Sequence, residues 1–120
     1  MDEKAGVEIL TQENAGIVVF KSASLTDVDK IASISRQITD FINQNQPNRL
    51  IFDFEHVKFF SSQVLGMLLD IRARLEAYHG QVVITAINPQ LHRVFRITNL
   101  DKIFRFFHDR ESAIQTINSN

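Results

Sequence analysis

The 120-residue chain contains no cysteine and no tryptophan, and each absence excludes certain kinds of site. Without cysteine there is no disulfide, no thiolate nucleophile and no zinc site with cysteine ligands, and the absence fits a reducing compartment. The aromatic residues are ten phenylalanines and one tyrosine. Such a set suits a packed interior better than a surface on which nucleotides or sugars stack.

The sequence also lacks a surplus of either charge and any long hydrophobic run. The formal net charge is −1, from 13 basic and 14 acidic side chains, whereas nucleic-acid-binding domains concentrate basic residues on one face. The apolar runs are far shorter than the roughly 20 residues that span a bilayer, and the first residues lack a signal-peptide core. We therefore expect a soluble, cytoplasmic protein that neither binds nucleic acid nor inserts directly into a membrane.

Patterns typical of catalysis and of metal binding are missing as well. The four histidines are scattered, and no pair has the i, i+4 spacing of a helical metal site. No Gly-rich phosphate loop is present, and no serine lies in the Gly-x-Ser-x-Gly elbow of a hydrolase. We predict that the protein is not an enzyme and has neither a metal nor a cofactor.

The sequence is rich enough in apolar residues for one core, since 44% of its residues are hydrophobic. No repeat or Pro/Gly-rich linker divides residues 1–120, so we predict a single domain. Hydrophobic periodicity predicts alternating strands and helices. The expected strands are residues 7–11, 17–21, 49–54, 81–86 and 103–107, and the expected helices are residues 26–44, 62–79, 89–98 and 109–117.

The order β-β-α-β-α-β-α-β-α predicts an α/β fold with a mixed sheet of four to five strands and about four helices. The first two strands form a hairpin with residues 13–16 as its turn, and helical connections make the later strands largely parallel. The run Leu50-Ile51-Phe52 is typical of a strand buried on both faces, and only Asp53 interrupts it.

The first helix has a candidate N-cap in Thr26 or Asp27. Its apolar stripe is expected to comprise Val28, Ile31, Ser35, Ile38 and Ile42, with Ile34 and Phe41 alongside. The stripe of the second helix is expected to comprise Val64, Leu68, Ile71, Leu75 and Tyr78, widened by Leu65 and Leu69.

One junction carries a functional signal: Phe59 and Phe60 stand directly before Ser61 and Ser62, which open the second helix. The junction follows the central strand, and sites in open α/β sheets lie at the carboxyl ends of strands. Two roles fit the serines. The commoner is capping, in which a serine oxygen accepts an amide of the first turn and adds about 1 kcal/mol. The other is phosphorylation, whose roughly −1.5 to −2 charges are tolerated at a helix N-terminus.

The junction resembles the signature of the STAS domain, the module of sulfate transporters and bacterial anti-sigma factor antagonists. The family pattern is an apolar strand ending in Asp, a short apolar loop, then Asp-Ser-Ser/Thr-Gly-Leu-Gly and an apolar helix. Asp53, Phe59-Phe60 and Leu65-Gly66 match it, and the predicted order of elements matches over nearly the whole chain. Ser62 falls on the phosphorylated serine, with Ser61 in place of the Asp, Gln63 at the next Ser/Thr position and Val64 in place of the first Gly.

The resemblance implies a non-enzymatic regulator that binds a partner anti-sigma factor, itself a serine protein kinase, and is switched by phosphorylation. A serine phosphatase is a further implied partner. The acceptor would be Ser62 or, alternatively, Ser61. The implied partner surface comprises Phe59, Phe60, Ser61, Ser62, Gln63, Val64 and Met67. Asp53 and, in an early loop, Thr26 or Asp27 would support it, with helix capping as the alternative role for the latter two.

The departures at Ser61 and Val64 motivate an alternative function. This is a constitutive scaffold subunit of the same fold, held in a larger assembly such as a stressosome-like particle or a lipid-transport complex. Tight co-purification that phosphatase treatment leaves unchanged would indicate it. A third hypothesis is a small-ligand sensor using the strand-end cleft, which nucleotides or lipids would stabilise. The sequence identifies neither the partner nor the oligomeric state.

Overall fold

The computed structural model describes residues 6–118, with side chains described as far as residue 116. Its main sheet has five strands in the order β1-β2-β4-β6-β7. β1 and β2 are antiparallel, and the other neighbours are parallel, as the sequence predicted. The strands of this sheet are β1 (Val7–Gln12), β2 (Ala15–Phe20), β4 (Arg49–Asp53), β6 (Gln81–Thr85) and β7 (Arg105–Phe107).

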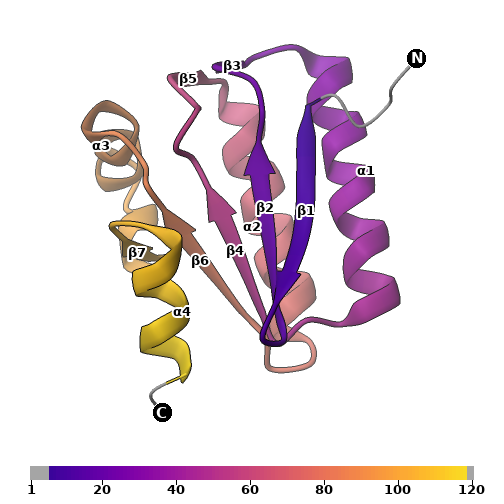
Figure 1. The fold of residues 1–120 in the computed structure, drawn as a ribbon. Helices are drawn as coiled ribbons and strands as arrows, with labels where there is room; N and C mark the ends of the chain where they lie inside the picture. The colour runs from indigo at the N-terminus through magenta and orange to yellow at the C-terminus, as the bar shows by residue number, and fades with distance from the viewer. Residues whose placement is uncertain (1–5, 119–120) are drawn as a thin grey trace.

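Helices lie on both faces of this sheet, which makes a three-layered α/β fold (Figure 1). α1 and α2 cover one face, and α4 crosses the other. α3 lies beside the carboxyl end of β6. The helices are α1 (Val28–Asn45), α2 (Ser62–Glu76), α3 (Pro89–Ile97) and α4 (Arg110–Asn118), with a short 3₁₀ turn, η1 (Leu100–Lys102). Within residues 6–118, no helix has the length and apolar character needed to cross a membrane.

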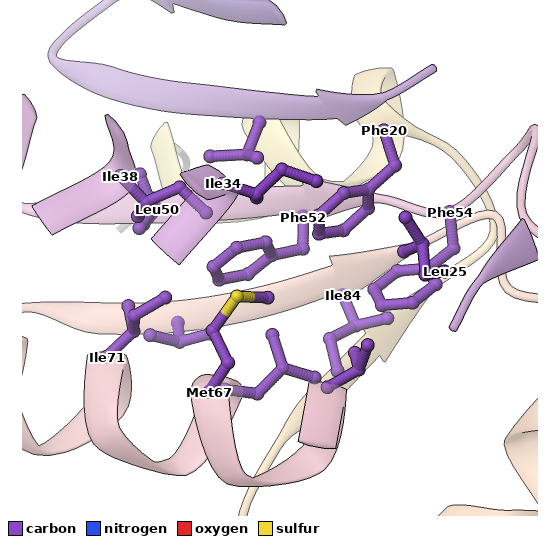
Figure 2. Packing of buried hydrophobic residues seen from close by; sticks show 14 of the residues in the cluster. Phe20, Leu25, Ile34, Ile38, Leu50, Phe52, Phe54, Met67, Ile71 and Ile84 are labelled. Carbon is purple, nitrogen blue, oxygen red and sulfur yellow. The ribbon is translucent and has the colours of Figure 1, made fainter. Parts of the chain in front are cut away.

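β4 lies at the centre of the sheet, and its side chains are buried on both faces. Leu50 and Phe52 point into the larger core beneath α1 and α2, while Ile51 belongs to the smaller core beneath α4. Phe52 stacks on Phe20 of the neighbouring strand, with ring centroids 5.9 Å apart (Figure 2). This confirms the prediction of a doubly covered strand, since its apolar run has no solvent-facing side.

The turn between β1 and β2 is shorter than predicted, because Ala15 and Gly16 already belong to β2. Only Glu13 and Asn14 form the turn, with φ of 51° and 71°. Positive φ at both central residues is the geometry of a type I′ turn, which matches the twist of a two-residue hairpin. The predicted four-residue turn was therefore wrong.

The start of α1 confirms one of the two predicted N-caps and corrects one position of the predicted apolar stripe. Asp27 is the N-cap: its carboxylate accepts a hydrogen bond of 2.8 Å from the amide of Lys30. Val28, expected in the apolar stripe, is 64% exposed because it lies on the first turn, beyond the reach of the sheet. The residues of α1 that are buried are Ile31, Ile34, Ile38 and Ile42.

Two further differences lie later in the chain. α2 ends at Glu76 rather than His79, because His79 adopts a left-handed conformation with φ of 71°. The last strand begins at Arg105 rather than at residue 103, since η1 occupies the preceding segment. α4 packs inward through Ala113 and Ile114, and the side chain of Ile117 lies outside the described residues.

The burial difference between two phenylalanines gives a direct test of this fold. Phe52 is fully buried and Phe59 is 61% exposed. We expect Phe52→Ala to lower the free energy of unfolding by about 3–5 kcal/mol, because it removes core contacts and leaves a cavity. The matched control Phe59→Ala should change it by less than about 0.5 kcal/mol. Urea denaturation measures both, and equal losses would contradict the structure.

Candidate functional site

A two-stranded parallel sheet, absent from the prediction, organises the junction before α2. It pairs β3 (Ser24–Leu25) with β5 (Phe59–Phe60) at the end of the molecule where the central parallel strands finish (Figure 1). The carbonyl oxygen of Leu25 accepts a bond of 3.0 Å from the amide of Ser61. Strands of two residues give no periodic signal, so sequence patterns could not reveal them.

This pairing brings the first turns of α1 and α2 together. The side-chain amide of Gln63 donates to the backbone oxygen of Val28 at 3.4 Å, which links the two helix starts directly. Thr26 is exposed in the same region, and its hydroxyl lies 3.2 Å from that of Ser24. The early loop and the serine junction are thus neighbours in space, as the resemblance implied.

The two serines differ sharply in their surroundings. Ser61 is the N-cap of α2 by backbone conformation, with φ of −91° and ψ of 167°, but its side chain makes no capping bond. Its Oγ is buried without a hydrogen-bond partner. Ser62 is the first residue of the helix and is exposed. Neither serine therefore makes the side-chain capping bond that was the commoner of the two expected roles.

The two phenylalanines of β5 divide into one anchored and one free ring. Phe60 is half-buried, and its ring packs edge-on against Phe54 and Phe95, each with a centroid distance of 6.0 Å. Phe59 is 61% exposed. Successive residues of an extended strand point to opposite sides, so burying one ring turns the other towards solvent.

Two residues of the expected partner surface lie inside the protein. Val64 and Met67 are both buried in the larger core, and Figure 2 shows Met67 pointing from α2 toward the sheet. On the outer side of the same helix, Gly66 is exposed, with nothing within 4 Å of the position a Cβ would take. The accessible part of the junction therefore consists of Phe59, Ser62, part of Gln63 and the bare backbone at Gly66.

Asp53, at the end of β4, is 2% exposed, and each of its two carboxylate oxygens accepts a hydrogen bond. One carboxylate oxygen accepts from Arg110 Nε at 2.8 Å, and the other accepts from the amide of Glu55 at 2.9 Å. The ion pair ties the central strand to the first turn of α4 and holds the start of the loop that leads to β5. Sequence reasoning singled out Asp53 but missed Arg110, because nothing local connects residues so far apart.

An open pocket of about 550 Å³ lies beside this ion pair, at the ends of β4, β6 and β7. Its lining includes Glu55, Phe107, Asp109 and Glu111. Asp109 caps α4 by accepting the amide of Ser112 at 2.8 Å, and that bond lowers the pKa of the Asp109 carboxyl. Among the described residues, no group of histidines and acids is arranged to hold a metal ion.

Comparisons with known proteins show the family to which the chain belongs. Residues 8–113 match the family model of the STAS domain. The anti-sigma F factor antagonist of Paenibacillus polymyxa is 18% identical over 108 residues, which cover 90% of this chain and 92% of that protein. The chain belongs to the STAS domain family.

Solved structures share the fold over almost the full length. The Bacillus cell fate determinant SpoIIAA, in its phosphorylated form, superposes with a TM-score of 0.72 at 23% identity, covering 92% of this chain and 98% of that one. A Thermotoga maritima protein described as an anti-sigma factor antagonist gives a TM-score of 0.82 at 16% identity, covering 97% of both chains. The predicted α/β architecture is thus confirmed.

The Asp53–Arg110 pair should stabilise the fold far more than a surface pair of the same chemistry. We expect Arg110→Ala to lower the free energy of unfolding by roughly 1–3 kcal/mol, because a buried carboxylate loses its charged donor. Arg74→Ala breaks the exposed Arg74–Asp70 pair, 3.2 Å long, and should cost at most about 0.5 kcal/mol. Urea unfolding of both variants compares them, and an equal effect would contradict a structural role for the buried pair.

Proposed function

We propose that this protein is a non-enzymatic regulatory module of the anti-sigma factor antagonist type. It binds an anti-sigma factor that is also a serine protein kinase, and phosphorylation of Ser62 switches that binding. A serine phosphatase reverses the modification, and the exchange takes place in the cytoplasm. The observation that carries the proposal is the exposed serine at the first position of α2, three residues after the exposed Phe59.

The difference in exposure supports Ser62 rather than the alternative, Ser61, as the proposed acceptor. A kinase must reach the hydroxyl oxygen, and the Ser61 Oγ is buried whereas Ser62 is exposed. Phosphate at Ser62 lies where the first amides of the helix and its dipole favour negative charge. The fold therefore tolerates the modification.

The same modification changes the surface that a partner meets. Uncharged, the junction presents the Phe59 ring, the Ser62 hydroxyl and the uncovered backbone at Gly66. A phosphate adds roughly −1.5 to −2 charges to this surface. A hundredfold loss of affinity requires only about 2.7 kcal/mol, which is small compared with the cost of desolvating such a charge against a partner.

Phosphorylation itself is the first prediction to check. We expect intact-mass and peptide mass spectrometry of the protein from its native host to find a phosphate on Ser62 that phosphatase removes. Ser62→Ala should abolish the modification, and the control Ser61→Ala should keep it. If no growth or stress condition yields a phosphate, the switch is refuted and the constitutive scaffold becomes the better function.

Docking can be tested separately from modification. Gly66 follows Ser62 by one helical turn, on the same face of α2, and its Cβ position is open. We expect Gly66→Arg to fold normally and to weaken partner binding at least about tenfold, because its side chain covers the proposed contact surface.

Ala73→Arg is the matched control, since Ala73 is also exposed on α2 but lies further along the helix. Binding is measured by titration against the kinase partner that co-purifies with the unphosphorylated protein. Unchanged binding by Gly66→Arg would place the contact surface elsewhere.

A further inference from the structure

The outer edge of β1 is unpaired among residues 6–118, although β1 is as long as β2. Figure 1 shows it as the last strand of the row. Four of its six residues are exposed: Glu8, Leu10, Thr11 and Gln12. The opposite end of the sheet is different, because β7 has only three residues.

The hydrogen-bond pattern shows which groups of β1 face outward. The carbonyl oxygen of Gly6 accepts from the amide of Lys21 at 3.0 Å, and the register pairs Val7 with Phe20. Bonded and non-bonded pairs alternate along an antiparallel ladder. The even-numbered residues of β1 therefore bond to β2, and the backbone groups of Val7, Ile9 and Thr11 point away from the sheet.

β1 carries few of the features that protect sheet edges. Protected edges are short or contain proline, lysine, bulges or inward-pointing charges. β1 has no proline or lysine, and its register with β2 runs without a bulge. Its one charge, Glu8, is paired with Lys21 at 3.1 Å. The edge is therefore suited to pairing with another strand.

We infer that the edge of β1 pairs antiparallel with β1 of a second copy of this chain, with Leu10 opposite Leu10 of that copy. A two-fold axis at Leu10 sets Ile9 against Thr11 of the second copy, so that their outward backbone groups bond to one another. Glu8 then lies opposite Gln12 of the second copy. The two leucines form the non-hydrogen-bonded pair, in which side chains are closest.

Other registers are less favourable for the same residues. Shifting the axis to Ile9 sets Leu10 against the Glu8 carboxylate of the second copy. Shifting it to Glu8 brings two glutamates directly opposite each other, which is repulsive. The chosen register is the one that covers Leu10, which is 37% exposed, with an apolar partner. The strand is thus complementary to itself, which favours a second copy over an unrelated peptide.

Sedimentation equilibrium of the full chain from micromolar to millimolar concentration tests this. The 13.8 kDa chain should show a concentration-dependent dimer. Leu10→Lys should weaken dimerisation at least about tenfold, because it sets two ammonium groups opposite each other. Leu69→Lys is the matched control, since Leu69 on α2 is also 37% exposed, and it should leave the dimer unchanged.

Hydrogen exchange supplies a second, residue-specific reading. On raising the protein concentration, the amides of Ile9 and Thr11 should become protected, while those of Glu8 and Leu10 are protected throughout by β2. A chain that stays monomeric at millimolar concentration overturns the inference. So does a dimer that survives Leu10→Lys, or one that forms without protecting Ile9 and Thr11. None of these outcomes depends on Ser62, so the proposed switch stands or falls separately.

Discussion

The burial of β4 on both faces is the constraint on which the rest of this structure depends. A strand covered on both sides cannot slip by one residue, because such a shift would exchange the side chains of its two cores. Its register therefore fixes where Asp53 ends the strand, and Asp53 holds both the loop toward β5 and the first turn of α4 through its two carboxylate oxygens. The position of the exposed junction is therefore set by an interior that cannot rearrange without a large cost in free energy.

The two departures from the family motif, at Val64 and Ser61, differ in their physical effect. Val64 replaces a glycine, and the resemblance placed it in the partner surface. Its side chain instead fills the core beneath α2, so the change concerns packing. Ser61 replaces an aspartate next to the proposed acceptor serine and leaves a buried hydroxyl without a partner. The neutral residue removes a charge from the junction, which lowers the negative potential near Ser62.

Sequence reasoning recovered what depends on long periodic patterns. The central strand, α1, α2 and the mixed sheet follow from apolar spacing that spans many residues, and the Phe-Phe-Ser-Ser junction follows from a local motif. It could not recover contacts that the fold alone creates. The pairing of β3 with β5 involves two residues on each side, and the Asp53–Arg110 bond joins distant segments. Met67, which the resemblance placed in the partner surface, is buried because it follows Val64 by three residues and so shares the inward face of α2.

The anchored ring of Phe60 has a consequence for how the junction meets other molecules. Because Phe60 is fixed between Phe54 and Phe95, the backbone beneath Phe59 is held before any encounter. A flexible loop would lose conformational freedom on binding, at about 0.5–1.5 kcal/mol for each immobilised side chain and more for its backbone. Here most of the backbone ordering has already taken place during folding, so a partner at this proposed surface would meet a preorganised backbone and immobilise mainly the Phe59 ring.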